Sequence, residues 1–161
     1  MIRPIIYSNS NIFIFLNILG WKNLWDENVF PWHKEDIHPK LEQRFETLIQ
    51  AAGKENASQC RFFVPLCGKS VDMIFLLKKG FQVIGCEGVE KACVDFFEEN
   101  SIDFTKKDVG DGITIFEAKN MNVKIACGDY FKLTPDILGG KMDCVWDRGS
   151  LVAINKSQRP E

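Results

Sequence analysis

Short apolar runs alternate with amphipathic stretches along this chain, and that order constrains its fold more than any other feature. Runs rich in aromatic and β-branched residues predict strands at 61–66, 81–86, 113–116, 123–127 and 142–146. Helical spacing of apolar residues predicts helices over 41–52, after Pro39 and before Gly53, over 71–79, between Ser70 and Gly80, and over 89–97. The order predicts an α/β fold, a mostly parallel, doubly wound sheet with right-handed crossovers.

Composition places the chain among globular proteins and excludes several functions. Its 161 residues suit one domain, and 20 basic against 22 acidic residues argue against a nucleic-acid-binding protein. Two histidines are too few for a histidine-rich metal centre, and no metal site is expected. No run approaches the about 18 consecutive apolar residues of a membrane-spanning helix. Six cysteines without a C-x-x-C pair are expected to be buried free thiols in a cytoplasmic protein.

Residues 1–17 differ from the rest of the chain, because they contain no acidic residue and many isoleucines and asparagines. A secretory signal is not predicted, since Arg3 is the one basic residue before the apolar run 12–16 and Gly20-Trp21-Lys22 is a poor cleavage site. We expect a poorly defined extension over 1–17 and one domain over 18–161.

Residues suited to ligand binding follow three of the predicted strands, where doubly wound sheets bind their ligands. Gly68 lets the backbone approach a ligand, or is ordinary turn punctuation. Glu87 lies 19 residues later, the spacing at which an acidic residue holds ribose hydroxyls. It could also be a solvated loop residue or the acidic first turn of the next helix. Asp129 and Tyr130 could hold an adenine by hydrogen bonding and stacking, or form a plain turn.

Several blocks of sequence together resemble the thiopurine S-methyltransferase family. The blocks are Phe63-Val-Pro-Leu-Cys-Gly-Lys-Ser-Val-Asp-Met73, Val83-Ile-Gly-Cys-Glu87, Gly128-Asp-Tyr-Phe131 and Asp143-Cys-Val-Trp-Asp-Arg-Gly-Ser-Leu-Val-Ala-Ile154. An aromatic segment upstream is also similar to that family, and contains Trp21, Trp25, Trp32, His33 and His38. The resemblance runs from residue 21 to residue 159, and a chance match of these blocks in this order is improbable.

The resemblance implies a Rossmann-like class I methyltransferase fold, which binds S-adenosylmethionine and methylates the sulfur of a small aromatic or heterocyclic thiol. It implies that the cofactor is contacted by Trp21, Trp25, Trp32, His33, Leu66, Gly68, Glu87, Asp129, Tyr130 and Arg148. Within that set, Glu87 would hold the ribose, Asp129 and Tyr130 would flank the adenine, and Trp32 would also meet the substrate. Arg148 is the catalytic candidate, because a cation beside the acceptor favours its thiolate. A complete protein of this kind is expected to be a monomer.

Simpler roles compete with these assignments. Trp21 and Trp25 could belong to the core, and His33 and His38 could cap helices. Asp147 and Arg148 could form a surface ion pair of little energetic value. Three lysines, Lys69, Lys78 and Lys79, are expected to be solvated.

The resemblance also implies that further strands and an acceptor-binding loop would follow Arg159, and this sequence does not contain them. We therefore expect the strand at 142–146 to lack a neighbour on one side, and the stability and activity of the chain to suffer. Three functions stay open: a thiol methyltransferase or its amino-terminal part, a non-enzymatic module that binds the cofactor or a partner chain, and an NAD-linked oxidoreductase. The last would need a G-x-G-x-x-G turn, which the sequence lacks.

Overall fold

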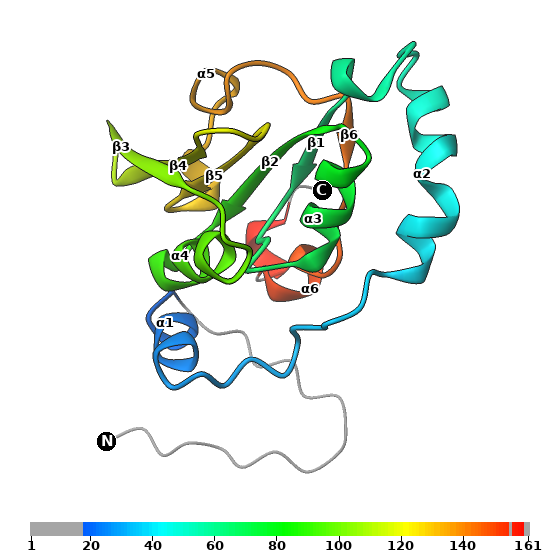
Figure 1. The fold of residues 1–161 in the computed structure, drawn as a ribbon. Coiled ribbons are helices and arrows are strands. Elements are labelled where there is room, and N and C mark those ends of the chain that lie inside the picture. The colour runs from blue at the N-terminus through cyan, green and yellow to red at the C-terminus, as the bar shows by residue number, and fades with distance from the viewer. Residues whose placement is uncertain (1–17, 155, 160–161) are drawn as a thin grey trace.

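The computed structural model describes residues 18–154 and 156–159 (Figure 1). Its α-helices are α1 (Ile18–Asp26), α2 (Pro39–Ala51), α3 (Val71–Lys78), α4 (Glu90–Glu99), α5 (Pro135–Leu138) and α6 (Ser150–Ala153). Its strands are β1 (Arg61–Val64), β2 (Gln82–Glu87), β3 (Phe104–Gly110), β4 (Ile113–Ala118), β5 (Val123–Cys127) and β6 (Cys144–Val145). Short 3-10 helices span Ala57–Gln59, Tyr130–Lys132 and Lys156–Gln158. The extension predicted over 1–17 lies outside the described residues.

Within the described part of the chain, the strands form one sheet in the order β3-β4-β5-β2-β1-β6. The pairs β6–β1, β1–β2 and β2–β5 are parallel, and α3 lies between β1 and β2 in the chain. The pairs β3–β4 and β4–β5 are antiparallel. The predicted α/β class with a mostly parallel sheet is therefore confirmed, with an antiparallel hairpin added at one edge.

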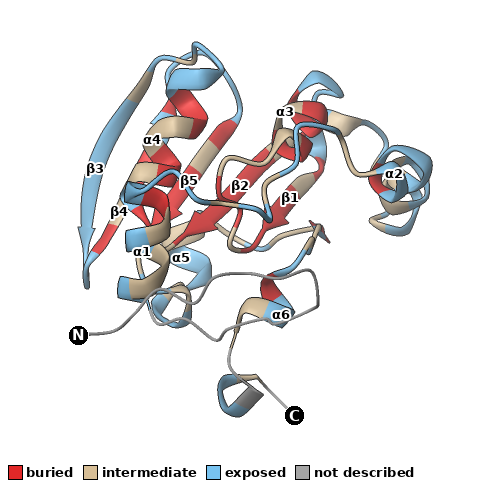
Figure 2. Cartoon of the chain, turned by 90° about the horizontal axis from the view of Figure 1, so that it is seen from below, coloured by how far each residue is buried: buried red, intermediate tan, exposed pale blue. Residues whose placement is uncertain are grey.

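Apolar side chains cover both faces of this sheet. On one face, buried residues of β1, β2 and β5 pack against α3 and α4, and part of α2 packs against the same cluster. On the other face, Phe63, Ile84 and Ile115 pack against the segment that contains Tyr130 and α5. Figure 2 shows the buried residues concentrated in the central strands, α3 and α4, whereas β3 and most of α2 are exposed. Because the sheet is packed on both faces, it can hold residues at its strand ends in fixed positions.

The helices α2 and α3 each begin directly after a residue whose side chain caps the helix. His38 caps α2, since its Nδ1 accepts the backbone N–H of Lys40 at 3.1 Å, and Pro39 occupies the first turn. Ser70 caps α3 through a 3.3 Å bond from the backbone N–H of Asp72 to its hydroxyl. These two caps confirm the helix starts expected from the sequence.

Two strands differ from the sequence-based expectation. The strand β3 was not predicted, because six of its seven residues are exposed and the sequence there shows no apolar alternation. Backbone pairing with β4 holds it, and charged side chains are typical of such edge strands. The run 142–146 was predicted as a strand, but β6 covers two residues, since in the described part it pairs with β1 alone.

The cysteines are free and buried, as predicted. Burial raises the pKa of Cys60 and of Cys86 to about 12, so these thiols stay protonated at neutral pH. No helix within residues 18–154 and 156–159 is long and apolar enough to cross a membrane.

Candidate functional site

The turns that follow β1, β2 and β5 lie side by side at the carboxyl ends of these parallel strands. The backbone N–H of Cys67, after β1, donates to the carbonyl of Cys86 at 2.8 Å. The backbone N–H of Gly128, after β5, donates to the carbonyl of Glu87 at 2.9 Å. The three segments selected from the sequence therefore meet at one edge of the sheet.

Glu87 joins the first two of these turns. Its Oε2 accepts the backbone N–H of Gly68 at 2.9 Å, and its Oε1 accepts those of Gly88 at 2.7 Å and Val89 at 3.0 Å. Burial raises the pKa of this carboxyl group, and the three N–H donors partly oppose that rise. The buried carboxylate is therefore not a solvated loop residue, and its bonds to Gly88 and Val89 lie directly before α4. Its role toward a ribose stays a prediction.

The turn after β1 has an unusual backbone. Leu66 and Gly68 have φ values of +44° and +51°, a left-handed region that side chains with a Cβ disfavour. A Cβ built on Gly68 would lie 3.2 Å from Cζ2 of Trp25, so the indole ring rests on the glycine itself. Gly68 is therefore more than turn punctuation, because it makes room for an aromatic side chain of the amino-terminal segment.

That aromatic segment forms a compact cluster. Trp25 stacks on Phe30 with centroids 4.8 Å apart, and Trp21 meets Trp32 edge-on at 4.9 Å. Trp25 is 2% exposed whereas Trp32 is 38% exposed, so one ring anchors the cluster and the other faces solvent. The ring centroid of His33 lies 6.0 Å from that of Phe30, in an edge-on arrangement. Burial lowers the pKa of His33, and the positive charges of Lys69 and Arg148 lower it further.

Lys69 was expected to be solvated, and that expectation is wrong. Its side chain is 10% exposed, and its Nζ lies 2.5 Å from Oε1 of Glu99 and 4.6 Å from the centroid of Phe30. The lysine stem follows the apolar cluster while the ammonium group finds a carboxylate on α4. Lys69 therefore ties the aromatic segment to the turn that contains Gly68.

Asp129 and Tyr130 begin the segment after β5. The Asp129 carboxylate is exposed and accepts the backbone N–H of Phe131 at 3.0 Å, which caps a short 3-10 helix. The Tyr130 ring stacks near Phe63 of β1 with centroids 6.5 Å apart, and burial raises the pKa of its hydroxyl. Both residues lie at the expected strand end, and Tyr130 packs on the sheet face covered by α5.

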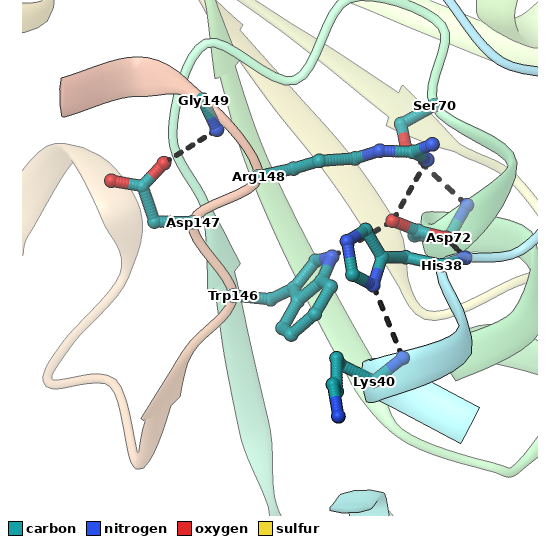
Figure 3. A network of polar contacts seen from close by, with 8 residues as sticks. All are labelled: His38, Lys40, Ser70, Asp72, Trp146, Asp147, Arg148 and Gly149. Carbon is teal, nitrogen blue, oxygen red and sulfur yellow. Dashed lines mark hydrogen bonds and ion pairs between the residues drawn. The ribbon is translucent and has the colours of Figure 1, made fainter. Parts of the chain in front are cut away.

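Arg148 does not pair with its neighbour Asp147, as a surface ion pair would require. Asp147 instead accepts the backbone N–H groups of Gly149 and Ser150 at the start of α6. Arg148 reaches across to α3, where its Nη1 lies 3.1 Å from Oδ2 of Asp72 (Figure 3). This contact brings the predicted cation to the helix that follows the Gly68 turn.

Asp72 is the functional candidate that reasoning from the sequence missed. Its side chain is fully buried, at 0% exposure, and Figure 3 shows donors converging on it from Trp146, Arg148 and the backbone of His38. A signal was present in the sequence, since Asp72 is the one acidic residue in the apolar stretch 71–77. Its partners are 34 to 76 positions away, and no local pattern shows them.

A family model described as thiopurine S-methyltransferase (TPMT) matches residues 16–161 of this chain. The chain belongs to the thiopurine S-methyltransferase family. Within the matched range lie the strand-end turns, the aromatic cluster and the Asp72 contacts, and the observed sheet fits the Rossmann-like class I methyltransferase fold that the resemblance implied. The predicted family and fold class are both confirmed.

Curated thiopurine S-methyltransferases from animals and bacteria are similar to the chain. A probable thiopurine S-methyltransferase of Danio rerio is 34% identical over 146 residues, which cover 89% of this chain and 60% of that protein. The thiopurine S-methyltransferase of Bordetella petrii is 37% identical over 142 residues, with coverages of 87% and 59%. That of Legionella pneumophila subsp. pneumophila is 38% identical over 141 residues, also with coverages of 87% and 59%. The chain spans about 60% of the length of these relatives.

Proposed function

We propose that the chain is an S-adenosylmethionine-dependent methyltransferase, or the cofactor-binding part of one, that acts on aromatic or heterocyclic thiols. The observation that carries this proposal is the contact between the Glu87 carboxylate and the Gly68 N–H, at the edge where β1, β2 and β5 end. Membership of the thiopurine S-methyltransferase family supports the class of reaction, and the names of the relatives support a thiol as acceptor.

The groups at this edge fit a nucleoside cofactor. A carboxylate offers about four lone-pair sites, and the Glu87 carboxylate accepts three backbone N–H groups, which leaves capacity for a ribose hydroxyl. Asp129 and Tyr130 follow the neighbouring strand, where they would flank an adenine. The turn of Leu66 and Gly68 and the cluster of Trp21, Trp25, Trp32 and His33 would enclose the remainder of the cofactor.

When bound, S-adenosylmethionine supplies a methyl group that its sulfonium already activates. The task of the protein is then to align a soft sulfur nucleophile with that methyl group and to exclude water. Arg148 would place a positive charge beside the acceptor sulfur, which lowers the pKa of the thiol and favours the thiolate. Trp32, the exposed ring of the cluster, would cover the acceptor. Cytoplasmic location and a monomeric state stay predictions.

Isothermal titration calorimetry tests the cofactor assignment directly. The chain should bind S-adenosylmethionine and S-adenosylhomocysteine, and should show no heat of binding with NAD. Turnover with thiophenol, followed as formation of methyl phenyl sulfide, then separates an enzyme from a binding module. Binding of NAD in place of S-adenosylmethionine would refute the proposal, and binding without turnover would reduce it to a cofactor-binding module.

Substitution of Arg148 tests the proposed role of its charge. Arg148→Ala should lower turnover of thiophenol, and the loss should be larger at acidic pH, where the acceptor needs help to ionise. If the variant keeps both cofactor affinity and turnover, the role assigned to Arg148 is wrong.

A further inference from the structure

The Asp72 carboxylate joins three separate parts of the chain. Its Oδ1 accepts the backbone N–H of His38 at 2.8 Å, at the start of α2. Its Oδ2 accepts both the indole Nε1–H of Trp146 at 2.9 Å and the Nη1–H of Arg148 at 3.1 Å, beyond β6. The His38 ring lies edge-on to Trp146 with centroids 5.4 Å apart, so the same groups also pack on one another.

Stability alone does not explain a buried charge at this position. Removing a carboxylate and its cation from water costs free energy, and apolar residues of similar volume often stabilise a fold as well or better. The first turn of α3 is otherwise apolar, and Met73 beside Asp72 is fully buried in the core. The carboxylate instead fixes the orientation of the Arg148 guanidinium, which lies at the end of a long side chain that has many rotamers in water.

Arg148 keeps part of its surface open while Asp72 holds it. The side chain of Arg148 is 25% exposed, and that of Asp72 is 0% exposed. One Nη1–H group points at the carboxylate, and a guanidinium has five N–H donors in a fixed plane, so other donors remain for a ligand. A guanidinium that is anchored on one side and accessible on the other is preorganised to receive an anionic group.

We propose that Asp72 is a positioning residue for the acceptor thiolate and acts through Arg148. This inference rests on the function proposed above, in which Arg148 lies beside the acceptor sulfur. Asp72 itself does not touch the substrate. It holds the guanidinium in one orientation. Because Oδ2 of Asp72 also accepts the indole N–H of Trp146, a ligand that contacts the guanidinium should also alter the indole hydrogen bond.

The test measures acceptor binding without requiring turnover. Thiophenol is titrated by calorimetry into the chain saturated with S-adenosylhomocysteine, for the parent and for Asp72→Asn, Arg148→Ala and the double variant. Asp72→Asn should weaken thiophenol binding by at least about tenfold, equivalent to about 1.4 kcal/mol. Affinity for S-adenosylhomocysteine should fall by a smaller factor than affinity for thiophenol, although Arg148 is also expected to contact the cofactor. In the Arg148→Ala background, Asp72→Asn should cause no further loss, because a residue that acts through another shows strong coupling in such a cycle.

Asp143→Asn is the matched control. Asp143 also pairs with a cation and accepts a backbone N–H, since its carboxylate lies 2.9 Å from Nζ of Lys54 and 2.9 Å from the N atom of Arg61. It lies before β6, at the opposite end of that strand from Arg148. The control should lose stability without a selective loss of thiophenol affinity.

A measurement on the parent covers the case in which Asp72→Asn fails to fold. Thiophenol should shift the NMR resonances of both the Arg148 guanidinium and the Trp146 indole N–H, because both groups donate to one carboxylate oxygen. An unmoved indole resonance at saturation, equal or tighter thiophenol binding by Asp72→Asn, or additive losses in the cycle would each overturn the inference and leave the proposed function intact. If the parent binds S-adenosylhomocysteine but no thiophenol, the acceptor assignment fails and this inference fails with it.

Discussion

Replacing Gly68 by alanine should destabilise the chain through two separable effects. The residue has a φ of +51°, and a left-handed backbone costs a residue with a Cβ about 1–2 kcal/mol. The new Cβ would also lie 3.2 Å from Cζ2 of the buried Trp25, and such crowding typically adds about 1–3 kcal/mol. We therefore expect Gly68→Ala to lower the free energy of unfolding by about 2–5 kcal/mol.

Urea denaturation at pH 7 measures this loss, and Gly53→Ala supplies the matched control. Gly53 has a φ of +64° but nothing within 4 Å of the built Cβ, so its substitution should show the backbone cost alone. Trp25→Phe removes the crowding atom, and the difference between Gly68→Ala and Gly53→Ala should shrink in that background. If both glycine variants lose the same stability within about 0.5 kcal/mol, the indole does not rest on the turn and the reasoning is refuted.

Three further predictions concern ligand binding. Glu87→Ala should weaken S-adenosylmethionine binding at least about tenfold, because charge-assisted hydrogen bonds contribute about 1.5–3 kcal/mol each, and equal affinities in calorimetry would remove Glu87 from the site. Acidification should weaken cofactor binding in the parent at a pH above the usual range of glutamate, because burial raises the pKa of Glu87, and Glu87→Gln should abolish that dependence. A raised pKa means that the folded chain holds this proton more tightly than the unfolded chain, so the stability linked to Glu87 is present below the unfolded pKa and lost as the pH rises through the folded pKa. The acid-induced loss of binding should thus occur without a loss of stability from this group, which urea titrations at each pH would check. Trp32→Ala should weaken cofactor binding by at least about threefold while lowering stability by only about 1 kcal/mol, and a larger loss of stability than of affinity would show that Trp32 is a core residue.

The sequence predicted the parts of the fold that have local causes. Ser70, Pro39, Gly53 and Gly80 mark helix ends through their own backbone and hydrogen-bonding chemistry, so the starts and stops of α2 and α3 were predictable. The turn at Gly68 and the carboxylate of Glu87 were predictable as neighbours, because parallel strands bring their carboxyl ends to one edge, but the hydrogen bond between them was not predicted.

The features that were missed depend on contacts distant in the chain. The strand β3 has exposed side chains, and its place is set by backbone pairing with β4, which leaves no apolar alternation to detect. Lys69 looked like any solvated lysine, because Glu99 and Phe30, which enclose it, lie on other elements. Asp72 resembled an ordinary acidic residue in the first turn of a helix, and only folding reveals the donors that converge on it.

The placement of the tryptophans gives this chain a built-in optical reporter. The chain contains 4 tryptophans, and the structure places three in the aromatic cluster and the fourth, Trp146, against the buried carboxylate of Asp72. The buried cluster beneath α3 and α4 consists of aliphatic residues, cysteines and phenylalanines, and Trp146 packs against its border. Intrinsic fluorescence excited at the indole band therefore reports on the aromatic cluster and on the surroundings of Asp72. Buried Trp25 should emit at shorter wavelength than half-exposed Trp32, so a ligand that covers the cluster should shift the red part of the spectrum first.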